Sequence, residues 1–594
     1  DLAVFVDSAV EGVEVQTEVA WRMAADANLP RLIFVNKLDR ERASFERTLA
    51  QLQERFGTGV APLELPLGEE TGFRGVADLL SESAFVYESQ GGGPPVATTT
   101  SLPDELAETE HPVRDSLIEG IVVADDELME RYLEGDVPNP KELEETLAKG
   151  VATATVFPVL CGSATKGIGV DRLASFVCEL GPSPLGRPPT EVRAGDRELE
   201  VACDPAGDPL AIVFKTIADP YVGKISLLKV VSGTIRPDIS LVNSRSHSEE
   251  RLHALFTLRG KEQDQVPEAQ AGDLVAVGKL ADTATGDTLA PRNQPVTVAA
   301  PARTPPMLSI AIRPKSKGDE DKLMTALHRL QDEDLALRVE RNDETRQTIL
   351  SGMGETHLAI AAERLQRKFG VDLETEELIV PYRETITKPA EAEGKYKKQT
   401  GGHGQFGVAN IKIEPRERGE GFEFVDKIVG GAIPRQFIPA VEKGVAESMV
   451  QGGVLRGYPV VDVRVICYDG KYHSVDSSEL SFKMAGSLGF KEAMSNAAPV
   501  LLEPISLLEV TVPNAYQGDV MGDLNARRGR VQGTETASHD EQTIVALVPT
   551  SEILRYATEL RSLTGGRGRF TVQHDHYDLM PTQLAERVPK RGEG

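Results

Sequence analysis

The stretch RLIFVNKLDR, residues 31–40, decides the fold at the start of this chain. Its first half, RLIFV, is a continuous apolar run typical of a buried strand, and its second half is a polar loop. Upstream, LAVFVD at residues 2–7 has the same apolar character, and residues 11–29 form a predicted helix that ends before Pro30. A strand, a helix and a strand at this spacing favour a parallel α/β sheet. We therefore predict an α/β domain over residues 1–181.

The polar loop, Asn36-Lys37-Leu38-Asp39, resembles the loop with which GTP-binding proteins recognise the guanine base. A carboxylate at Asp39 can accept two parallel hydrogen bonds from the guanine N1–H and N2 amino group, a donor pair that adenine lacks. In this interpretation Lys37 packs its stem on the purine and Asn36 ties the loop to its neighbours. The alternative interpretation of the same residues is a polar turn after a strand.

A second loop, CGSATKG at residues 161–167, follows the predicted strand TVFPVL. Its Ser163-Ala164 pair resembles the second guanine-contacting loop of the same class, in which backbone N–H groups meet the guanine O6. The predicted cofactor is GTP or GDP, bound by Asn36, Lys37, Asp39, Ser163 and Ala164.

Two motifs of this class do not occur in the 594 residues. The sequence contains no G-x-x-x-x-G-K-[ST], which would hold the β- and γ-phosphates, and no D-x-P-G-H, which would hold the magnesium-linked aspartate. We therefore expect the chain as given to bind GTP poorly, to hydrolyse none and to contain no catalytic or metal-binding residue. The phosphate loop, the switch segments and the Mg²⁺ ligands would lie in a missing N-terminal part of roughly 60 to 100 residues.

Composition narrows the class of protein. A chain of 594 residues is too long for one hydrophobic core. The net charge of -27 excludes a uniformly basic protein that coats nucleic acid, although a local basic patch remains compatible with it. The four cysteines show no C-x-x-C pair, which favours free thiols in the cytoplasm, and no apolar run is long enough to span a membrane.

Linkers and periodicity divide the chain further. Proline-rich stretches lie at 181–190 and 301–307, and residues 101–150 carry 15 acidic against 4 basic side chains. The predicted domains are a partial GTPase domain at 1–181 with an acidic helical insert at about 65–150, an antiparallel β-barrel at 190–300, a ferredoxin-like domain at 305–382, a mixed elongated domain at 383–502 and a second ferredoxin-like domain at 503–590. The predicted fold class is multidomain α/β and α+β.

A glycine-rich segment at 402–407 fits G-x-G-x-x-G, but a strand rather than a helix follows it, so a dinucleotide site is rejected. With lysines just before it, the segment is either a solvated hairpin tip or a loop that presses against RNA phosphates. Asp476 and Glu479 have the spacing of a capping box before a helix. The preceding Lys471-Tyr472-His473 could be surface residues or could stack on RNA bases. The same two interpretations apply to the arginine clusters at 527–530 and 567–569.

Several longer blocks together are similar to bacterial elongation factor G, in the family's order. They are FRGVADLL, DPYVGK, GDTLA, GMGETHL, VGGAIPRQFIPAVEKG, YHSVDSSELSFKMAG and GDLNARRG, and the resemblance runs from residue 1 to about 585. It implies a GTPase in the full-length form and a GTP-driven movement of tRNA and mRNA through the ribosome, with ribosome recycling open as a secondary role. It also implies contact with ribosomal RNA, with tRNA and mRNA at the decoding centre and with the ribosomal stalk protein, in a cytoplasmic monomer with no membrane association. The implied RNA-contacting residues are Lys398, Gly402, His403, Gly404, Gln405, Lys471, Tyr472, His473, Asp476, Arg527 and Arg528.

Departures from the family pattern, at Thr356, Ala359 and His403, suggest a divergent paralogue of the main factor. Two alternative functions therefore stand beside translocation. One is a nucleotide-incompetent paralogue that binds the ribosome without turnover. The other is a ribosome-protection protein that expels tetracycline, which is disfavoured because YHSVDSSELSFK resembles the translocase sequence.

Overall fold

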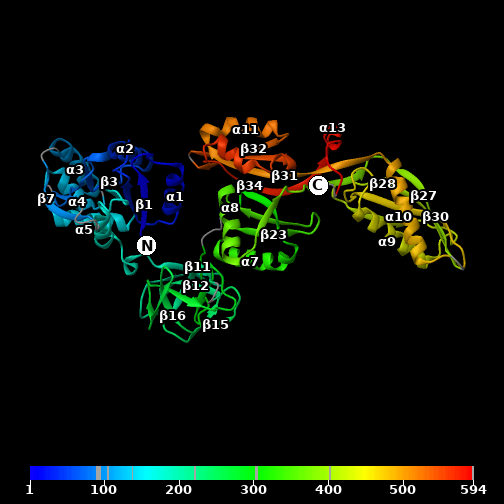
Figure 1. Cartoon of the computed structure of the whole chain (residues 1–594), viewed down its shortest axis with the longest axis horizontal. Coiled ribbons are helices and arrows are strands. Elements are labelled where there is room, and N and C mark those ends of the chain that lie inside the picture. The colour runs from blue at the N-terminus through cyan, green and yellow to red at the C-terminus, as the bar shows by residue number, and fades with distance from the viewer. Residues whose placement is uncertain are drawn as a thin grey trace. The chain divides into compact units, whose positions relative to one another are not determined.

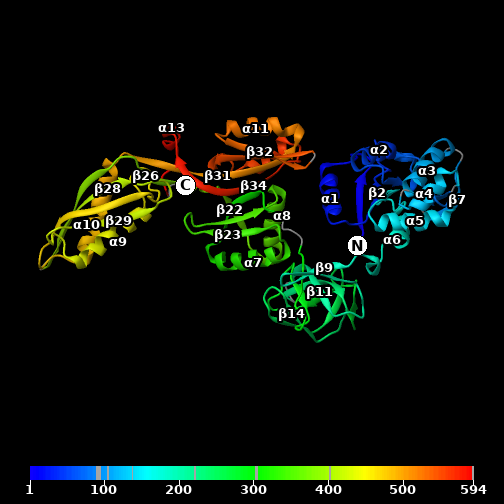
Figure 2. The same ribbon diagram turned by 180° about the vertical axis from the view of Figure 1, so that it is seen from behind.

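The computed structural model describes residues 1–88, 95–103, 106–122, 124–136, 138–219, 223–300, 305–400, 403–538 and 540–591, with the backbone alone at 107–110, 317, 399, 400 and 403. It comprises two compact units, Asp1–Pro301 and Ala302–Gly594. Each unit is described by itself (Figures 1 and 2). No helix in the described part of the chain is long and apolar enough to cross a membrane.

The first unit begins with the predicted parallel sheet. Its four strands lie in the order β1-β2-β8-β3, and every pair is parallel. The apolar run at 31–35 is buried throughout, as expected for a strand inside a parallel sheet. The bounds are β1 Ala3–Ser8, β2 Arg31–Asn36, β3 Val60–Pro62 and β8 Phe157–Cys161, with helices α1 Val15–Asp26, α2 Phe45–Phe56 and α6 Val170–Leu180.

Residues 64–152, which we call the insert, differ from the sequence prediction. The prediction of a helical segment at 65–150 is wrong for its first half, where four strands form an antiparallel sheet in the order β4-β5-β6-β7. Each of these strands is only four to six residues long, too short for a periodicity that separates strand from helix. The acidic second half is helical, as predicted. The bounds are β4 Glu64–Leu67, β5 Gly75–Asp78, β6 Ser83–Glu88, β7 Val96–Ser101, α3 Ala107–Val122, α4 Asp126–Leu133 and α5 Pro140–Ala152.

The region from 190 to 300 consists of strands, as predicted. Its main sheet has eight antiparallel strands in the order β15-β14-β20-β11-β12-β19-β16-β17 around a core of buried aliphatic side chains. The main strands are β11 Leu210–Asp219, β12 Gly223–Ser232, β14 Ile239–Asn243, β15 Glu249–Leu252, β16 Leu255–Arg259, β17 Glu262–Val266, β19 Leu274–Gly278 and β20 Thr288–Ala290. Two smaller sheets hold β9 Thr190–Ala194, β10 Arg197–Val201 and β21 Thr297–Val298, and β13 Thr234–Ile235 and β18 Ala269–Gln270.

The second unit contains both predicted ferredoxin-like patterns. The first has the order βαββαβ along the chain and a sheet ordered β23-β24-β22-β25, with β22 Leu308–Pro314, α7 Glu320–Glu333, β23 Arg338–Asn342, β24 Gln347–Gly352, α8 Glu355–Arg364 and β25 Leu373–Glu376. The second repeats it with β31 Pro499–Pro513, α11 Gln517–Ala526, β32 Arg530–Ser538, β33 Glu541–Pro549, α12 Tyr556–Leu563 and β34 Arg569–Leu579.

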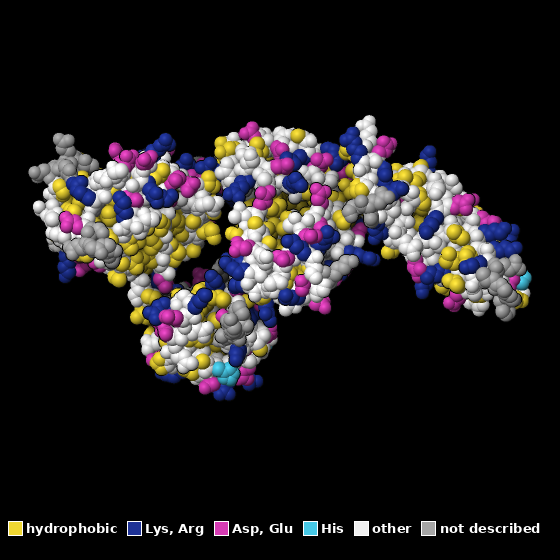
Figure 3. Space-filling model, in the orientation of Figure 1, with side chains coloured by type: hydrophobic (Ala, Val, Ile, Leu, Met, Phe, Trp, Pro, Cys, Tyr) yellow, Lys and Arg dark blue, Asp and Glu magenta, His cyan; other side chains and the backbone are white. Residues whose placement is uncertain are grey.

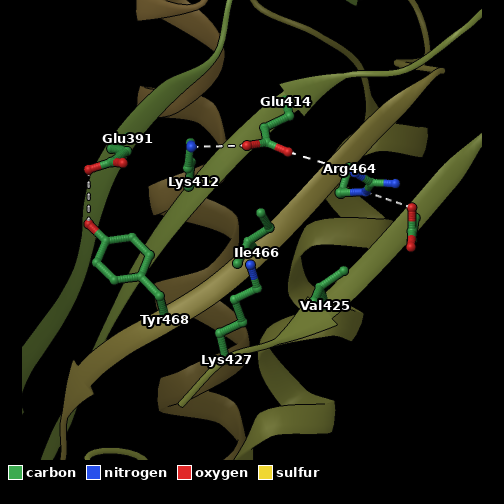
Figure 4. Close-up of a pocket in the computed structure, with 9 residues that line it drawn as sticks. Glu391, Lys412, Glu414, Val425, Lys427, Arg464, Ile466 and Tyr468 are labelled. Carbon is green, nitrogen blue, oxygen red and sulfur yellow. Dashed lines mark hydrogen bonds and ion pairs between the residues drawn. The ribbon is translucent and has the colours of Figure 1, made fainter. Parts of the chain in front are cut away.

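The elongated domain between them is a four-stranded sheet covered on one face by two helices. The order is β27-β28-β30-β29, and the helix α10 packs so closely on β27 that a Cβ at Gly394 would lie 2.0 Å from the Ala485 carbonyl oxygen. The opposite face is open and lined by charged side chains and by Tyr468, as Figure 4 shows. The bounds are β27 Ala390–Thr400, β28 His403–Pro415, α9 Ile438–Gln451, β29 Phe422–Asp426, β30 Val463–Lys471 and α10 Glu479–Asn496.

The junction between the elongated and C-terminal domains differs from the expected boundary at 502/503. Strand β31 runs through that position, and β26 (Arg383–Ile386) pairs with it rather than with the elongated domain's sheet. Glu384 in β26 is fully buried, and its carboxylate accepts hydrogen bonds from four consecutive backbone N–H groups, at residues 455–458. This carboxylate ties the base of the elongated domain to the C-terminal sheet, and no local sequence pattern predicted it.

Candidate functional site

The loop after β2 is built by the end of a buried strand. Leu38 is fully buried and anchors the loop, with its amide nitrogen 3.3 Å from the Gly162 carbonyl oxygen. Lys37 has a φ of +65°, the left-handed region that few side chains adopt, which turns the chain sharply after Asn36. The flanking Asn36 and Asp39 side chains are therefore presented at the carboxyl edge of the sheet, where open α/β sheets bind their ligands.

The two loops predicted from the sequence lie together. Because β2 and β8 are parallel neighbours, their carboxyl ends meet at one edge of the sheet. The Ala164 amide donates a hydrogen bond of 2.9 Å to Asn36 Oδ1, so Asn36 ties the first loop to the second, as predicted. Ser163 is fully buried and exchanges two backbone hydrogen bonds with Ile168, which closes the second loop into a rigid turn. A guanine O6 would have to share the Ala164 N–H with Asn36.

The Asp39 carboxylate has the capacity that guanine recognition needs. Its Oδ1 atom is buried and has no hydrogen-bond partner among the described residues. A buried acceptor without a donor is costly, so a ligand that brings an N–H donor pair would satisfy it. The Lys37 ammonium pairs with Glu11 Oε2 at 3.2 Å. The pKa of Glu11 is held below its usual value by the Ser8 hydroxyl and by this lysine.

A magnesium site does not fit the residues that the structure describes. No group of three or more His, Cys, Asp and Glu side chains is placed to hold a metal ion within the described ranges. We derive no catalytic step from the residues at the carboxyl edge of the sheet.

A second candidate site lies at the far end of the elongated domain. We call the ends of β27 and β28 together with loop 472–478 the tip. The Gly404 amide donates to Asp476 Oδ1 at 3.1 Å, and the Phe406 amide donates to the Asp476 carbonyl oxygen at 2.8 Å. The Ser477 hydroxyl donates to the Phe406 carbonyl oxygen at 2.8 Å. The two tip segments that the sequence analysis singled out are thus joined into one surface.

The predicted capping box between Asp476 and Glu479 does not form. The helix α10 begins at Glu479 and is capped by Ser478, whose hydroxyl accepts from the Ser481 amide. A helix that starts at residue 479 takes residue 478 as its N-cap, so Asp476 is free to bridge the two tip segments. Sequence spacing could not show this contact because its two partners, Gly404 and Asp476, are 72 residues apart.

His473 is held in a defined orientation at the tip. Its Nδ1 atom lies 3.2 Å from the Asp476 amide nitrogen and 3.3 Å from Asp476 Oδ2. Its own amide donates to the Ser477 hydroxyl at 2.9 Å. The His473 side chain remains 56% exposed, and Tyr472 beside it is 50% exposed. The ring is therefore rigidly positioned and yet accessible.

Several lysines lie on the strands that lead to the tip. Lys398 and Lys471 are exposed, and Lys395 and Lys397 lie on the same strand as Lys398. Figure 3 shows lysine and arginine side chains gathered at the end of the elongated domain. Gln405 accepts a hydrogen bond from the Tyr396 hydroxyl. Of the other predicted tip residues, Gly402 lies outside the described residues and the side chain of His403 is not described.

Arg527 and Arg528 have a different environment from the one predicted. Arg527 forms a two-pronged contact with Asp523 at 2.8 and 3.0 Å. Arg528 does the same with Glu503 at 2.7 and 2.9 Å. The hydrogen bonds from these carboxylates hold the pKa of each guanidinium above its usual value. Both guanidinium groups are engaged by carboxylates in this structure, and their contact with RNA stays a prediction.

A parallel sheet with two guanine-type loops at one edge, followed by a strand-rich domain and a long domain with an exposed tip, defines a multidomain protein with a nucleotide-binding type of α/β domain. Family models match the whole succession: the Elongation factor Tu GTP binding domain at 1–183, Elongation factor G domain 2 at 208–291, domain III at 304–377, domain IV at 379–498 and the Elongation factor G C-terminus at 500–588. A crystal structure of a protein from Thermus thermophilus is similar, with a TM-score of 0.76 and 38% identity over 99% of this chain and 84% of that chain. The chain belongs to the elongation factor G family.

Proposed function

We propose that this chain is a translation elongation factor that binds GTP or GDP and promotes the movement of tRNA and mRNA on the ribosome. The observation that carries the nucleotide half of the proposal is the unpartnered Asp39 Oδ1 atom, beside two loops that Asn36 holds together. In this proposal the two N–H donors of the guanine base hydrogen-bond to the Asp39 carboxylate, and the buried Leu38 side chain anchors the loop in position.

The ribosomal half of the proposal depends on the tip. An exposed imidazole beside a tyrosine and several lysines suits contact with single-stranded bases and phosphates. The protein as a whole carries a net charge of -27, so a local basic patch is the part that can approach RNA. His473 is held by hydrogen bonds at its amide and at its ring, and we propose that it contacts the tRNA–mRNA pair at the decoding centre.

The remaining partners follow from the same assignment. We propose that the acidic helical half of the insert contacts the stalk protein, and that the factor acts as a monomer in the cytoplasm. The departures at Thr356, Ala359 and His403 favour a divergent paralogue within the family.

Single-turnover translocation on purified ribosomes tests this function. The full-length protein with GTP is expected to accelerate movement of the mRNA at least tenfold over spontaneous movement, and a non-hydrolysable analogue is expected to give less acceleration. A rate equal to the spontaneous rate, with and without GTP, would remove the translocase assignment.

A second candidate is a ribosome-binding paralogue that does not turn over nucleotide. The observation that favours it is the set of departures from the family pattern at Thr356, Ala359 and His403. It predicts co-sedimentation with ribosomes that is equally strong with GTP, with GDP and without nucleotide. For the translocase, we expect retention to depend on the nucleotide.

A further inference from the structure

A fully buried glutamate lies directly behind the second guanine-type loop. Glu64 is the first residue of β4 in the insert, and none of its surface is exposed. Its Oε2 atom accepts a hydrogen bond from the Cys161 amide at 3.2 Å. Cys161 is the last residue of β8, and Ser163 follows two residues later. The glutamate therefore contacts the strand at the point where the loop begins.

The hydrogen bond from the Cys161 amide to Glu64 replaces a strand-to-strand hydrogen bond that β3 does not supply. Strand β3 pairs with β8 only as far as Pro62, and the Leu63 amide makes the last contact, 2.9 Å from the Val159 carbonyl oxygen. On the other side of β8, the Gly162 amide donates to the Val35 carbonyl oxygen at 2.9 Å. The Cys161 N–H thus faces the side from which β3 has departed. The Glu64 carboxyl satisfies a buried amide that would otherwise have no acceptor.

The second oxygen of Glu64 faces an arginine of the GTP-binding domain. Glu64 Oε1 lies 3.7 Å from Arg172 Nε, and neither atom has a hydrogen-bond partner within the described part of the chain. Arg172, in α6, reaches Asp78 Oδ2 in β5 of the insert at 2.7 Å. Its guanidinium lies over the rings of Phe85 and Phe176, at 4.4 and 4.7 Å. One buried network therefore joins the insert's sheet, α6 and the end of β8.

We propose that Glu64 is a positioning residue for the guanine loop: its carboxyl fixes the backbone of β8 ahead of Ser163 and Ala164, and Arg172 couples that backbone to the sheet of the insert. This inference depends on the proposed binding of guanine nucleotide. It follows that a partner that displaces the insert's sheet changes the affinity for the base, although the sheet contains none of the base-contacting residues.

Two substitutions of Glu64 distinguish the effect of losing the hydrogen-bond acceptor from the effect of changing the size of the side chain. Glu64→Leu keeps the approximate shape and removes the acceptor, whereas Glu64→Gln keeps an acceptor oxygen for the Cys161 N–H. Glu250→Leu is the matched control. Glu250 is a buried glutamate of the strand-rich domain that accepts hydrogen bonds from two backbone N–H groups, at 3.0 and 2.8 Å, and it lies far along the chain from the loop. The readouts are the affinity for a fluorescent GDP and the hydrogen exchange of the amides at 161–166.

We expect Glu64→Leu to weaken GDP binding about tenfold and to speed exchange at 161–166, with Glu64→Gln close to the wild type in both readouts. Glu250→Leu should leave both unchanged. Should Glu64→Leu fail to fold, Arg172→Met takes its place, and we expect a several-fold loss of GDP affinity from it.

Wild-type affinity and wild-type exchange at 161–166 in folded Glu64→Leu would overturn the inference. So would wild-type behaviour of Arg172→Met where it is the variant tested, or an equal loss in Glu64→Gln and Glu64→Leu. A wild-type protein that binds no GDP would contradict the proposed function instead. The exchange measurement, which needs no nucleotide, would still decide whether Glu64 fixes the loop.

Discussion

The Oδ1 atom of Asn36 lies 2.9 Å from the amide nitrogen of Ala164, although 128 residues separate the two along the chain. This hydrogen bond, together with the contact of 3.3 Å between the Leu38 amide and the Gly162 carbonyl oxygen, joins the loops that follow two neighbouring parallel strands. It makes the geometry of one guanine-type loop depend on the other. A ligand that contacts Asp39 and the Ser163-Ala164 turn at the same time needs that geometry fixed before it binds.

Replacing Asn36 with alanine should release the second loop from the first. We expect Asn36→Ala to weaken GDP binding roughly fivefold. The variant loses one hydrogen bond, which contributes about 1 kcal/mol, and the two loops can then move more independently. The control is Asn139→Ala, which removes a side-chain acceptor of the same type at the N-cap of α5. Titration with a fluorescent GDP measures both variants, and equal affinities in the two would contradict the prediction.

His473 should matter for movement on the ribosome and not for folding. We expect His473→Ala to slow single-turnover translocation at least tenfold, with an unchanged unfolding temperature, because the ring is 56% exposed. The matched control is His253→Ala, whose exposed ring lies 3.4 Å from Asp238 much as His473 lies 3.3 Å from Asp476. Translocation at the wild-type rate in His473→Ala would remove this residue from the RNA-contacting set.

Glu384 should hold the elongated domain to the C-terminal sheet. We expect Glu384→Ala to destabilise the second unit by roughly 3 kcal/mol, since four backbone N–H groups lose their acceptor. Glu384→Gln should cost less, because the amide keeps one oxygen. Urea unfolding and hydrogen exchange at 455–458 measure the effect. The exposed Glu393→Ala serves as control, and a similar small effect in both alanine variants would refute the role of Glu384.

Glu64 should make the first unit less stable as the pH rises. Burial, helped by the nearby Asp78 and Asp171, raises the pKa of Glu64 to about 8, although the Cys161 N–H and Arg172 act to lower it. The unfolded chain releases this proton near pH 4.3, whereas the folded chain keeps it to about pH 8. The contribution of protonated Glu64 to the free energy of unfolding is therefore complete below about pH 4.3 and is lost as the pH rises toward 8.

Comparison of the wild type with Glu64→Gln isolates this contribution. The denaturant midpoint of unfolding is measured for both proteins at pH 5.5 and at pH 8.0. From the lower to the higher pH, the midpoint should fall more in the wild type than in Glu64→Gln, because the glutamine has no proton to release. An equal fall in both proteins would show that Glu64 ionises with an ordinary pKa.

The guanine-type loops could be predicted from the sequence because their chemistry is local. Asn36 and Asp39 follow a continuous apolar strand, and the same is true of Ser163, so the parallel sheet brought them to one edge. The insert's sheet escaped prediction because its strands are too short to show a period. The carboxylate partners of Arg527 and Arg528 could not be predicted, because an arginine cluster has the same sequence whether its partners are phosphates or carboxylates. The partners of Arg528, Glu503 and Glu552, lie 25 and 24 residues away, beyond any local pattern.

The measurement that tests the central claim most directly is the choice between GDP and xanthosine diphosphate in wild type and Asp39→Asn. Xanthine carries a carbonyl oxygen in place of the guanine N2 amino group, so an amide donor at residue 39 suits it better than a carboxylate does. We predict that the wild type prefers GDP and that Asp39→Asn prefers xanthosine diphosphate, with a change of at least tenfold in the ratio of affinities. The exposed Asp26→Asn, on α1, should keep the wild-type preference. An unchanged preference in Asp39→Asn would mean that the loop at 36–39 is a turn of the chain and does not recognise the base.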